Sequence, residues 1–236
     1  MSSEDERTRV SNTSSPAGRA SINFVDLSKG IRQDIYKRLL AVAHPIYLFQ
    51  DKGSRVETFA PDKPARWLAL LYVNQQVHSE ARTVLYGMNR FTLVDTTQQQ
   101  VGLLRSFLNC IGSMNADLLS HLSINFPAVE RMEDQPGARE VNIRDDGLQG
   151  LRLLQEKCTH LTTLETFIHS KNSSLLTGTD EDSSRLVQEA LPRIDAQLKA
   201  IPSLKKIIVR VYIATLPPLV MDLMQGLGWV VLFGDR

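Results

Sequence analysis

The sequence predicts an α/β protein whose second half repeats helix–strand units and builds a mainly parallel sheet. An L-x-x-L-x-I spacing recurs at residues 119–124, 161–166, 204–209 and 227–232, with the last copy closer to its predecessor than the others. Each copy follows an apolar run with helical periodicity and enters a segment rich in β-branched residues. Parallel strands need long crossovers, so this alternation predicts that the four copies lie side by side in one sheet.

The chain divides into three expected regions. Residues 1–20 are polar, carry no aromatic residue and are expected to form a disordered tail. Residues 21–95 are expected to hold helices and a β-hairpin whose turn is at residues 51–54, and residues 96–236 the α/β repeats. We expect the last two regions to share one continuous core.

The first helix is predicted to begin after Ser28, whose hydroxyl is a suitable N-cap, and to end near residue 43. Its apolar residues Ile31, Ile35 and Leu39 recur at steps of one helical turn. Two long polar stretches without periodicity, residues 133–147 and 170–184, are predicted to be exposed loops.

The stretch LLYVNQQVHSEARTVLYGMNRF, residues 70–91, has an apolar face with helical spacing and polar residues around it. Asn74 is predicted to cap the helix after a bend. We expect Glu80 to form an ion pair with Arg32 of the first helix, and His78 and Arg82 to be solvated. The alternative is that Glu80 and His78 line a cleft as an acid–base pair.

Bulk properties exclude several classes of protein. With 27 basic against 26 acidic residues and a net charge of +1, the composition predicts no nucleic-acid or membrane partner. Only two cysteines are present, which argues against a disulfide framework. The absence of an apolar leader or membrane-spanning run predicts a cytoplasmic or nuclear protein.

The sequence lacks the common motifs of catalytic and cofactor-binding sites. It contains no phosphate-cradling glycine pattern and no serine in a nucleophile elbow, so no catalytic or cofactor-binding residue is predicted and no cofactor is expected. Cys158 and His160 lack a second pair of metal ligands, and Cys158 is expected to pack inward at a helix end. A hydrolase whose catalytic residues are scattered along the chain remains the least favoured alternative.

Two stretches of the chain resemble the paired signatures of F-box-like proteins of filamentous fungi. The stretch FVDLSKGIRQDIYKRLL is similar to F-x-x-L-P-x-E-I-R-x-x-I-Y-x-x-L-L, with Ser28 and Gly30 in place of the usual Pro and Glu. Residues 70–91 are similar to L-L-x-V-N-R-Q-I-x-x-E-A-x-x-x-L-Y-x-x-N-x-F. The resemblance covers residues 22–94, and the repeats after it resemble irregular leucine-rich repeats.

This resemblance implies a non-enzymatic protein-binding scaffold. An F-box docks the small adaptor protein of a cullin–RING ubiquitin ligase, which implies partner-binding roles for Leu27, Ile31, Tyr36 and Leu39. The polar residues Arg32, Asn74 and Glu80 are assigned structural roles. The alternative is an interaction protein with no ligase link, in which the same apolar residues pack inside the core and Ile31→Asp unfolds the chain.

Overall fold

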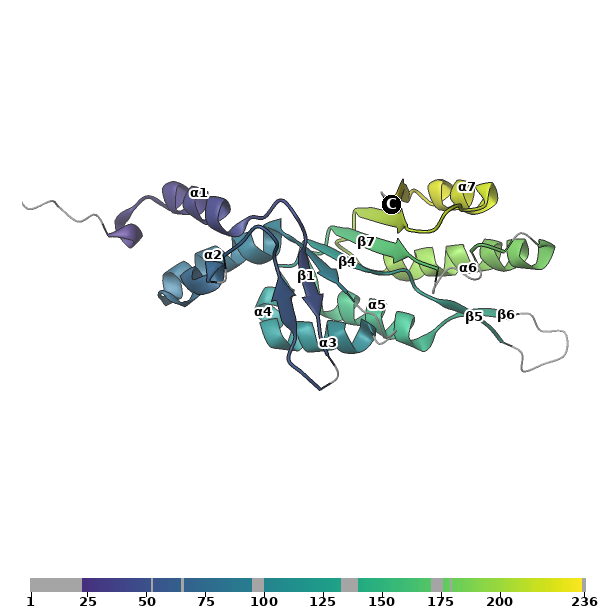
Figure 1. The fold of residues 1–236 in the computed structure, drawn as a ribbon, viewed down its shortest axis with the longest axis horizontal. Helices are drawn as coiled ribbons and strands as arrows, with labels where there is room; N and C mark the ends of the chain where they lie inside the picture. The colour runs from purple at the N-terminus through teal and green to yellow at the C-terminus, as the bar shows by residue number, and fades with distance from the viewer. Residues whose placement is uncertain are drawn as a thin grey trace, which may run out of the picture.

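The computed structural model describes residues 23–51, 53–64, 66–94, 100–132, 140–170, 176–178 and 180–234. The expected disordered tail, residues 1–20, lies outside this part of the chain. The protein has a mixed α/β fold built on a largely parallel sheet (Figure 1). Among the described residues, no helix combines the length and the apolar character needed to cross a lipid bilayer.

The N-terminal part of the fold contains the predicted helices and hairpin. Ser28 caps the first helix by accepting a hydrogen bond from the Ile31 backbone N–H (3.4 Å), as predicted, but the helix ends at residue 40 rather than near 43. In the hairpin turn, Gly53 adopts a φ of 80°, which favours glycine. The elements are the 3₁₀ turn η1 (Phe24–Asp26), α1 (Lys29–Leu40), β1 (Ile46–Phe49), β2 (Glu57–Phe59), the 3₁₀ turn η2 (Trp67–Tyr72), α2 (Gln75–Met88) and β3 (Arg90–Leu93).

The rest of the chain alternates helices and strands as the repeats predict. Its elements are α3 (Gln100–Ile111), α4 (Ser113–Ala116), β4 (His121–Asn125), β5 (Val129–Met132), β6 (Glu140–Ile143), α5 (Asp145–Lys157), β7 (Thr163–Ile168), α6 (Glu181–Lys199), β8 (Lys206–Val211), α7 (Pro218–Gly226) and β9 (Val230–Phe233). The strands β5 and β6 form a small antiparallel sheet of their own.

Within the described residues, seven strands form the main sheet in the order β2-β1-β3-β4-β7-β8-β9. Only the β1–β2 hairpin pairs antiparallel, and every other neighbouring pair is parallel. The four spaced copies in the sequence become the adjacent strands β4, β7, β8 and β9, which confirms that they lie side by side. In the first three copies, Leu122, Leu164 and Ile207 occupy one row across the sheet.

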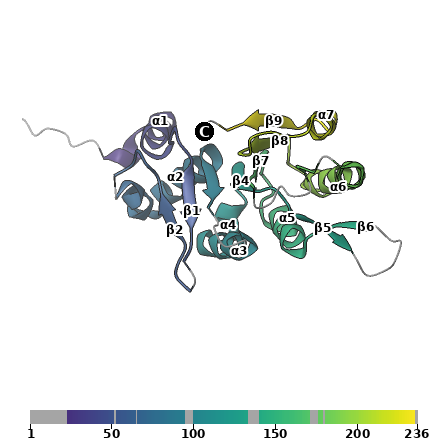
Figure 2. The same cartoon turned by 45° about the vertical axis from the view of Figure 1, so that its right-hand side comes forward.

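The two faces of this sheet differ in chemistry. From β1 onward, each later strand of the sheet is added at the same edge. The helices α3, α5 and α6 lie together on one side of these strands (Figure 2). The side chains of the Leu122 row belong to the hydrophobic core on that side. Alternate residues point the other way. Among the described residues of β3, β4, β7 and β8, most of these alternate positions are polar, and we call this side the polar face: Arg90, Thr92, His121, Ser123, Asn125, Thr163, Glu165, Phe167, Lys206, Ile208 and Arg210.

The register of the fourth copy differs from the one its spacing predicts. The spacing aligns Val230 with Ile207, but Val230 pairs with Ile208, one residue further along. This shift turns Val230 and Leu232 away from the core, and each remains 38% exposed. The cause is Trp229, which is buried and donates a hydrogen bond from Nε1 to Asp195 Oδ1 on α6 (2.9 Å).

Both predicted loops are shorter than expected. The first contains β6, in which Val141 and Ile143 are buried, and the start of α5. The second ends in the first turn of α6, where Asp180 accepts a hydrogen bond from the Ser183 backbone N–H and caps the helix. The predictions failed here because short strands and polar caps carry little apolar periodicity. Residues 133–139 and 171–175 lie outside the described residues.

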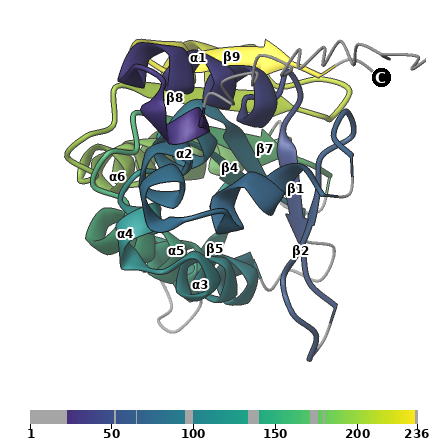
Figure 3. The same ribbon diagram turned by 90° about the vertical axis from the view of Figure 1, so that its left-hand side faces the viewer.

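One large hydrophobic core extends through the described residues, and a second, smaller cluster contains Val141, Leu186 and Ala190. The large core runs from Tyr36 of α1 to Trp229 beside β9. Because β1 and β3 hydrogen-bond into the same sheet as β4, the N-terminal elements are continuous with the repeats and are not a separate layer (Figure 3).

Because of the register of β9, two leucines of the repeat are expected to differ in how much they contribute to the free energy of unfolding. Leu164→Ala removes a side chain with 0% exposure and is expected to lower the free energy of unfolding by about 2–5 kcal/mol. Leu232→Ala, at 38% exposure, is expected to cost less than about 1 kcal/mol. Urea denaturation followed by circular dichroism measures both values. Equal losses would show that the fourth copy keeps the register of the first three.

Candidate functional site

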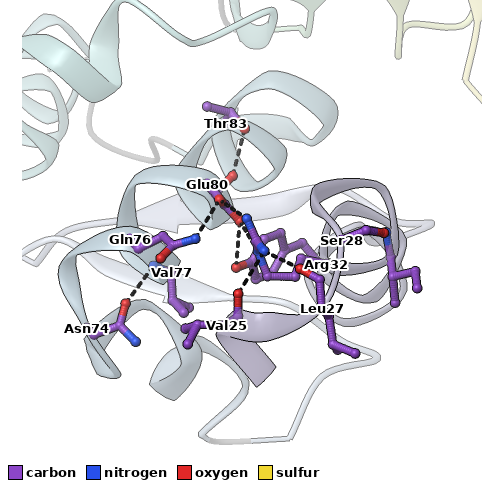
Figure 4. Close-up of polar contacts among 11 residues, drawn as sticks. Val25, Leu27, Ser28, Arg32, Asn74, Gln76, Val77, Glu80 and Thr83 are labelled. Carbon is purple, nitrogen blue, oxygen red and sulfur yellow. Dashed lines mark hydrogen bonds and ion pairs between the residues drawn. The ribbon is translucent and has the colours of Figure 1, made fainter. Parts of the chain in front are cut away.

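The helices α1 and α2 pack together around a buried ion pair (Figure 4). Arg32 donates from Nε to Glu80 Oε2 (2.8 Å) and from Nη2 to Glu80 Oε1 (2.6 Å). The exposed fractions of the two side chains are 9% and 15%. Such paired hydrogen bonds between a guanidinium and a carboxylate are directional as well as strong. The ion pair predicted between these two residues is therefore confirmed.

Other groups complete the environment of this pair. Tyr36 donates its hydroxyl hydrogen bond to Glu80 Oε2 (3.1 Å), and Gln76 donates to Oε1 (3.3 Å). The hydrogen bonds from Arg32, ahead of those from Gln76 and Tyr36, lower the pKa of Glu80 to about 2 against the opposing effect of burial. Glu80 is therefore a structural carboxylate that stays ionised well below neutral pH.

Arg32 also fixes the chain that enters α1. Its Nη1 donates to the backbone carbonyls of Val25 (3.1 Å) and Leu27. At the start of α2, the Asn74 side chain accepts a hydrogen bond from the Val77 backbone N–H (2.8 Å), which confirms its predicted capping role. The three residues assigned structural roles therefore act together: two form the ion pair and the third orients the helix that carries Glu80.

Asn89 is a further structural residue that the sequence analysis did not single out. Its side chain is fully buried and donates to the carbonyls of Leu40 and Leu85, both at 2.8 Å. Its oxygen accepts from the Val42 backbone N–H at 2.8 Å. Asn89 therefore joins the end of α1 to the end of α2. Its place in the second signature was the only signal in the sequence.

The predicted partner-binding residues do not share one environment. Ile31 and Leu39 are 51% and 48% exposed, and Leu27 is partly exposed just before the helix. With Ile35, these residues are spaced by four and line one side of α1, which we call the α1 stripe. Tyr36 differs because it points inward, with 0% exposure, to reach Glu80. Its assignment to the partner-facing surface is corrected: Tyr36 supports the ion pair.

The predicted solvation of His78 and Arg82 is only partly right. His78 is exposed, but its Nδ1 lies 2.9 Å from the Leu71 carbonyl oxygen. Arg82 is partly buried, and its Nε has no hydrogen-bond partner within the described residues. No contact joins His78 to Glu80 in this part of the chain. The geometry therefore does not support the alternative in which these two residues form an acid–base pair.

A second polar cluster lies in the middle of the polar face. Its centre is Glu165 of β7, which is 1% exposed. Arg210 Nε lies 2.5 Å from its Oε1, and Arg90 Nη1 lies 3.1 Å from its Oε2. His121 Nε2 and Ser123 Oγ lie 3.6 Å and 3.4 Å from Oε2. Burial raises the pKa of Glu165, but the hydrogen bonds and charges of its basic neighbours outweigh burial and hold the pKa at about 2.

The remaining candidates for chemistry are inert or isolated. Cys158 caps the end of α5 with 0% exposure, as predicted, and burial raises the pKa of its thiol to about 12. His160 is exposed and lies 3.5 Å from the Asp117 carboxylate. In the described ranges, no group of three or more histidine, cysteine or acidic residues is arranged to hold a metal ion.

Comparisons with known proteins add no family to this description. No family model, no curated protein and no solved structure matches the chain.

The Glu80 carboxylate predicts a loss of stability in acid. Because its folded pKa of about 2 lies below the ordinary 4.5, Glu80 stabilises the fold fully above pH 4.5, and this contribution is lost as the pH falls towards 2. Glu80→Gln is expected to lower the melting temperature by several degrees at pH 7 and to flatten its decline below pH 4.5. The control is Glu181→Gln, which breaks an exposed helical pair with Arg185 and should change little. Thermal melts at stepped pH measure both, and parallel curves for wild type and Glu80→Gln would contradict the assignment.

Asn89→Ala is expected to destabilise the protein without changing an exposed side chain, because Asn89 is fully buried. The variant leaves buried backbone groups of α1 and α2 without partners, at a cost of about 1–3 kcal/mol in the free energy of unfolding. Asn109→Ala, at an exposed position of α3, serves as the matched control. Urea denaturation measures the difference, and equal midpoints for the two variants would disprove the bridging role.

Proposed function

We propose that this protein is a non-enzymatic, protein-binding scaffold whose α1 stripe docks a protein partner. The observation that carries the proposal is the exposure of Ile31 and Leu39, in the first and the last turn of one helix. In an amphipathic helix such a stripe normally faces the core. Here the buried positions of α1 are instead Arg32, Tyr36 and Leu40, so the apolar stripe remains at the surface.

The partner that best fits the resemblance is the small adaptor of a cullin–RING ubiquitin ligase. The proposed F-box-like region then comprises residues 22–94, and the repeats are the irregular leucine-rich-repeat-like part that holds a second protein. The departures at Ser28 and Gly30 are compatible with this role. Ser28 has a φ of −58°, which suits the proline found in the family, and a Cβ at Gly30 meets no atom within 4 Å.

Docking through the α1 stripe is tested by Ile31→Asp and Leu39→Asp in the full chain. Tagged wild-type protein is expected to retain the purified adaptor, and each variant should retain roughly tenfold less because a charge is buried in an apolar contact. Melting temperatures should stay within about 2 °C of wild type, since both side chains are half exposed. Met114→Asp, at a 69% exposed apolar position of α4, is the matched control and should bind normally.

The outcomes separate the competing interpretations. If Ile31→Asp unfolds the protein, the stripe belongs to the core and the docking proposal fails. If the wild type does not retain the adaptor, the ligase link fails, and the alternative of an interaction protein with a different partner takes its place. Restoring the family residue with Gly30→Glu provides a gain-of-function arm, in which adaptor retention is expected to rise.

A further inference from the structure

The strand β9 forms one outer edge of the main sheet, and the described residues place no strand beyond it. It lies at the margin of the molecule in two views (Figure 1 and Figure 2). Residues 227–234, LGWVVLFG, contain no charged residue and no proline, which are the usual features that keep an edge strand from pairing. The opposite edge, β2, differs because all three of its residues are exposed and one of them is Glu57. The β9 edge is therefore the one that is suited to pair.

The backbone of β9 alternates between β8 and the open edge. Gly234 donates its N–H to the carbonyl oxygen of Val211 in β8 (2.9 Å). Successive residues of a strand direct their backbone groups to opposite sides, so Leu232 also directs its N–H and C=O towards β8. The N–H and C=O groups of Val231 and Phe233 are directed to the open edge. These two residues therefore present the donors and the acceptors that a further strand needs.

Apolar side chains flank this edge on both sides of the sheet. Val230 and Leu232 are each 38% exposed on the side of the polar face, and Phe233 is 50% exposed on the other side. Tyr212, directly after β8, covers Gly234, since a Cβ on this glycine would meet the tyrosine ring. The ring fills the space that a side chain of residue 234 would occupy. The exposed apolar groups are thus consecutive along the edge and differ from the isolated ones that protein surfaces commonly carry.

The edge of β9 is complementary to the same edge of a second copy. In an antiparallel pair, residues whose backbone groups face one another exchange both hydrogen bonds, so Val231 of one copy meets Phe233 of the other. The two-fold axis then passes beside Leu232, which faces its own counterpart. Val230 faces Gly234 of the other copy, next to the ring of Tyr212 there. Every one of these cross-strand contacts is apolar, and none of them buries a charge.

A second symmetric register is less suitable. An axis beside Val231 also pairs the outward backbone groups, but it sets Phe233 opposite Trp229. Trp229 is buried and donates to Asp195, so its side chain is directed into the core before β9 begins. The register with its axis beside Leu232 uses only residues at the open edge.

We propose that β9 pairs antiparallel with β9 of a second copy of this chain, which joins two sheets into one in a two-fold symmetric dimer. An uncharged edge favours an uncharged partner strand, and the second copy supplies one in matching register. The net charge of +1 produces little repulsion between copies. Glu57 protects the outer edges that remain, so assembly ends at the dimer. This inference is independent of docking at the α1 stripe.

The dimer is expected to be weak. A standard interface buries about 800 Å² on each partner, and a four-residue strand provides less than that. The expected Kd is on the order of 10 µM. Sedimentation velocity of the full chain from about 5 to about 500 µM should therefore show a shift from monomer to dimer and no larger species.

Charge reversal at the axis tests the partner and the register together. Leu232→Lys and Leu232→Glu each place like charges directly opposite one another and should raise the Kd at least roughly tenfold. An equimolar mixture of the two variants sets Lys against Glu and should dimerise again. Met114→Lys, at a 69% exposed apolar position of α4, is the control and should dimerise as wild type does. Melting temperatures should stay within about 2 °C, since Leu232 is 38% exposed.

Amide hydrogen exchange of the wild type, followed by NMR, does not depend on the fold of any variant. Exchange at Val231 and Phe233 should slow as protein concentration rises, whereas Leu232, whose N–H faces β8, should be protected at every concentration. The proposal is overturned by a chain that stays monomeric at about 500 µM or assembles beyond a dimer. It is equally overturned by a mixture of variants that does not associate, or by exchange at Val231 and Phe233 that is independent of concentration.

Discussion

The ion pair between Arg32 and Glu80 sets the orientation of α1 on α2. A guanidinium withdrawn from water needs its donors satisfied, and here a carboxylate and two backbone carbonyls supply the acceptors. These partners lie on α2 and in the turn before α1, so only one rotation of α1 brings Arg32 to all of them. Since neighbouring residues of a helix are about 100° apart, the positions next to Arg32 are turned aside. Ile31, the residue before Arg32, is 51% exposed for that reason.

The two faces of the sheet differ in the side chains that they carry. Strands that succeed one another in one direction bring their crossover helices to the same side, where leucine, isoleucine and valine side chains form the core. The opposite face carries the Glu165 cluster. Its buried carboxylate is tolerated because positive groups from β3 and β8 surround it. Apolar packing on one side of the sheet thus stabilises the core, and the ionised Glu165 cluster lies on the other side.

The successes and failures of the sequence predictions have separate physical causes. The caps Ser28 and Asn74, and the spacing that aligns β4, β7 and β8, depend on residues close together in the chain, and these predictions are confirmed. In the fourth copy, Val230 and Leu232 face away from the core, because Trp229, outside the repeated pattern, enters the core to reach Asp195. The Glu165 cluster was missed because its members come from four strands, and no spacing along the chain brings them together.

By itself, the sequence determined the main helices, the hairpin and the helix–strand alternation of the repeats, and it paired Arg32 with Glu80 because structural ion pairs are common. Only the tertiary structure decided which side of α1 is buried and which residues share the polar face. Periodicity and capping act over a few residues, whereas Glu165 lies 75 and 45 positions from the two arginines it contacts. Contacts across such separations follow from strand order and register, which are set when the whole core packs.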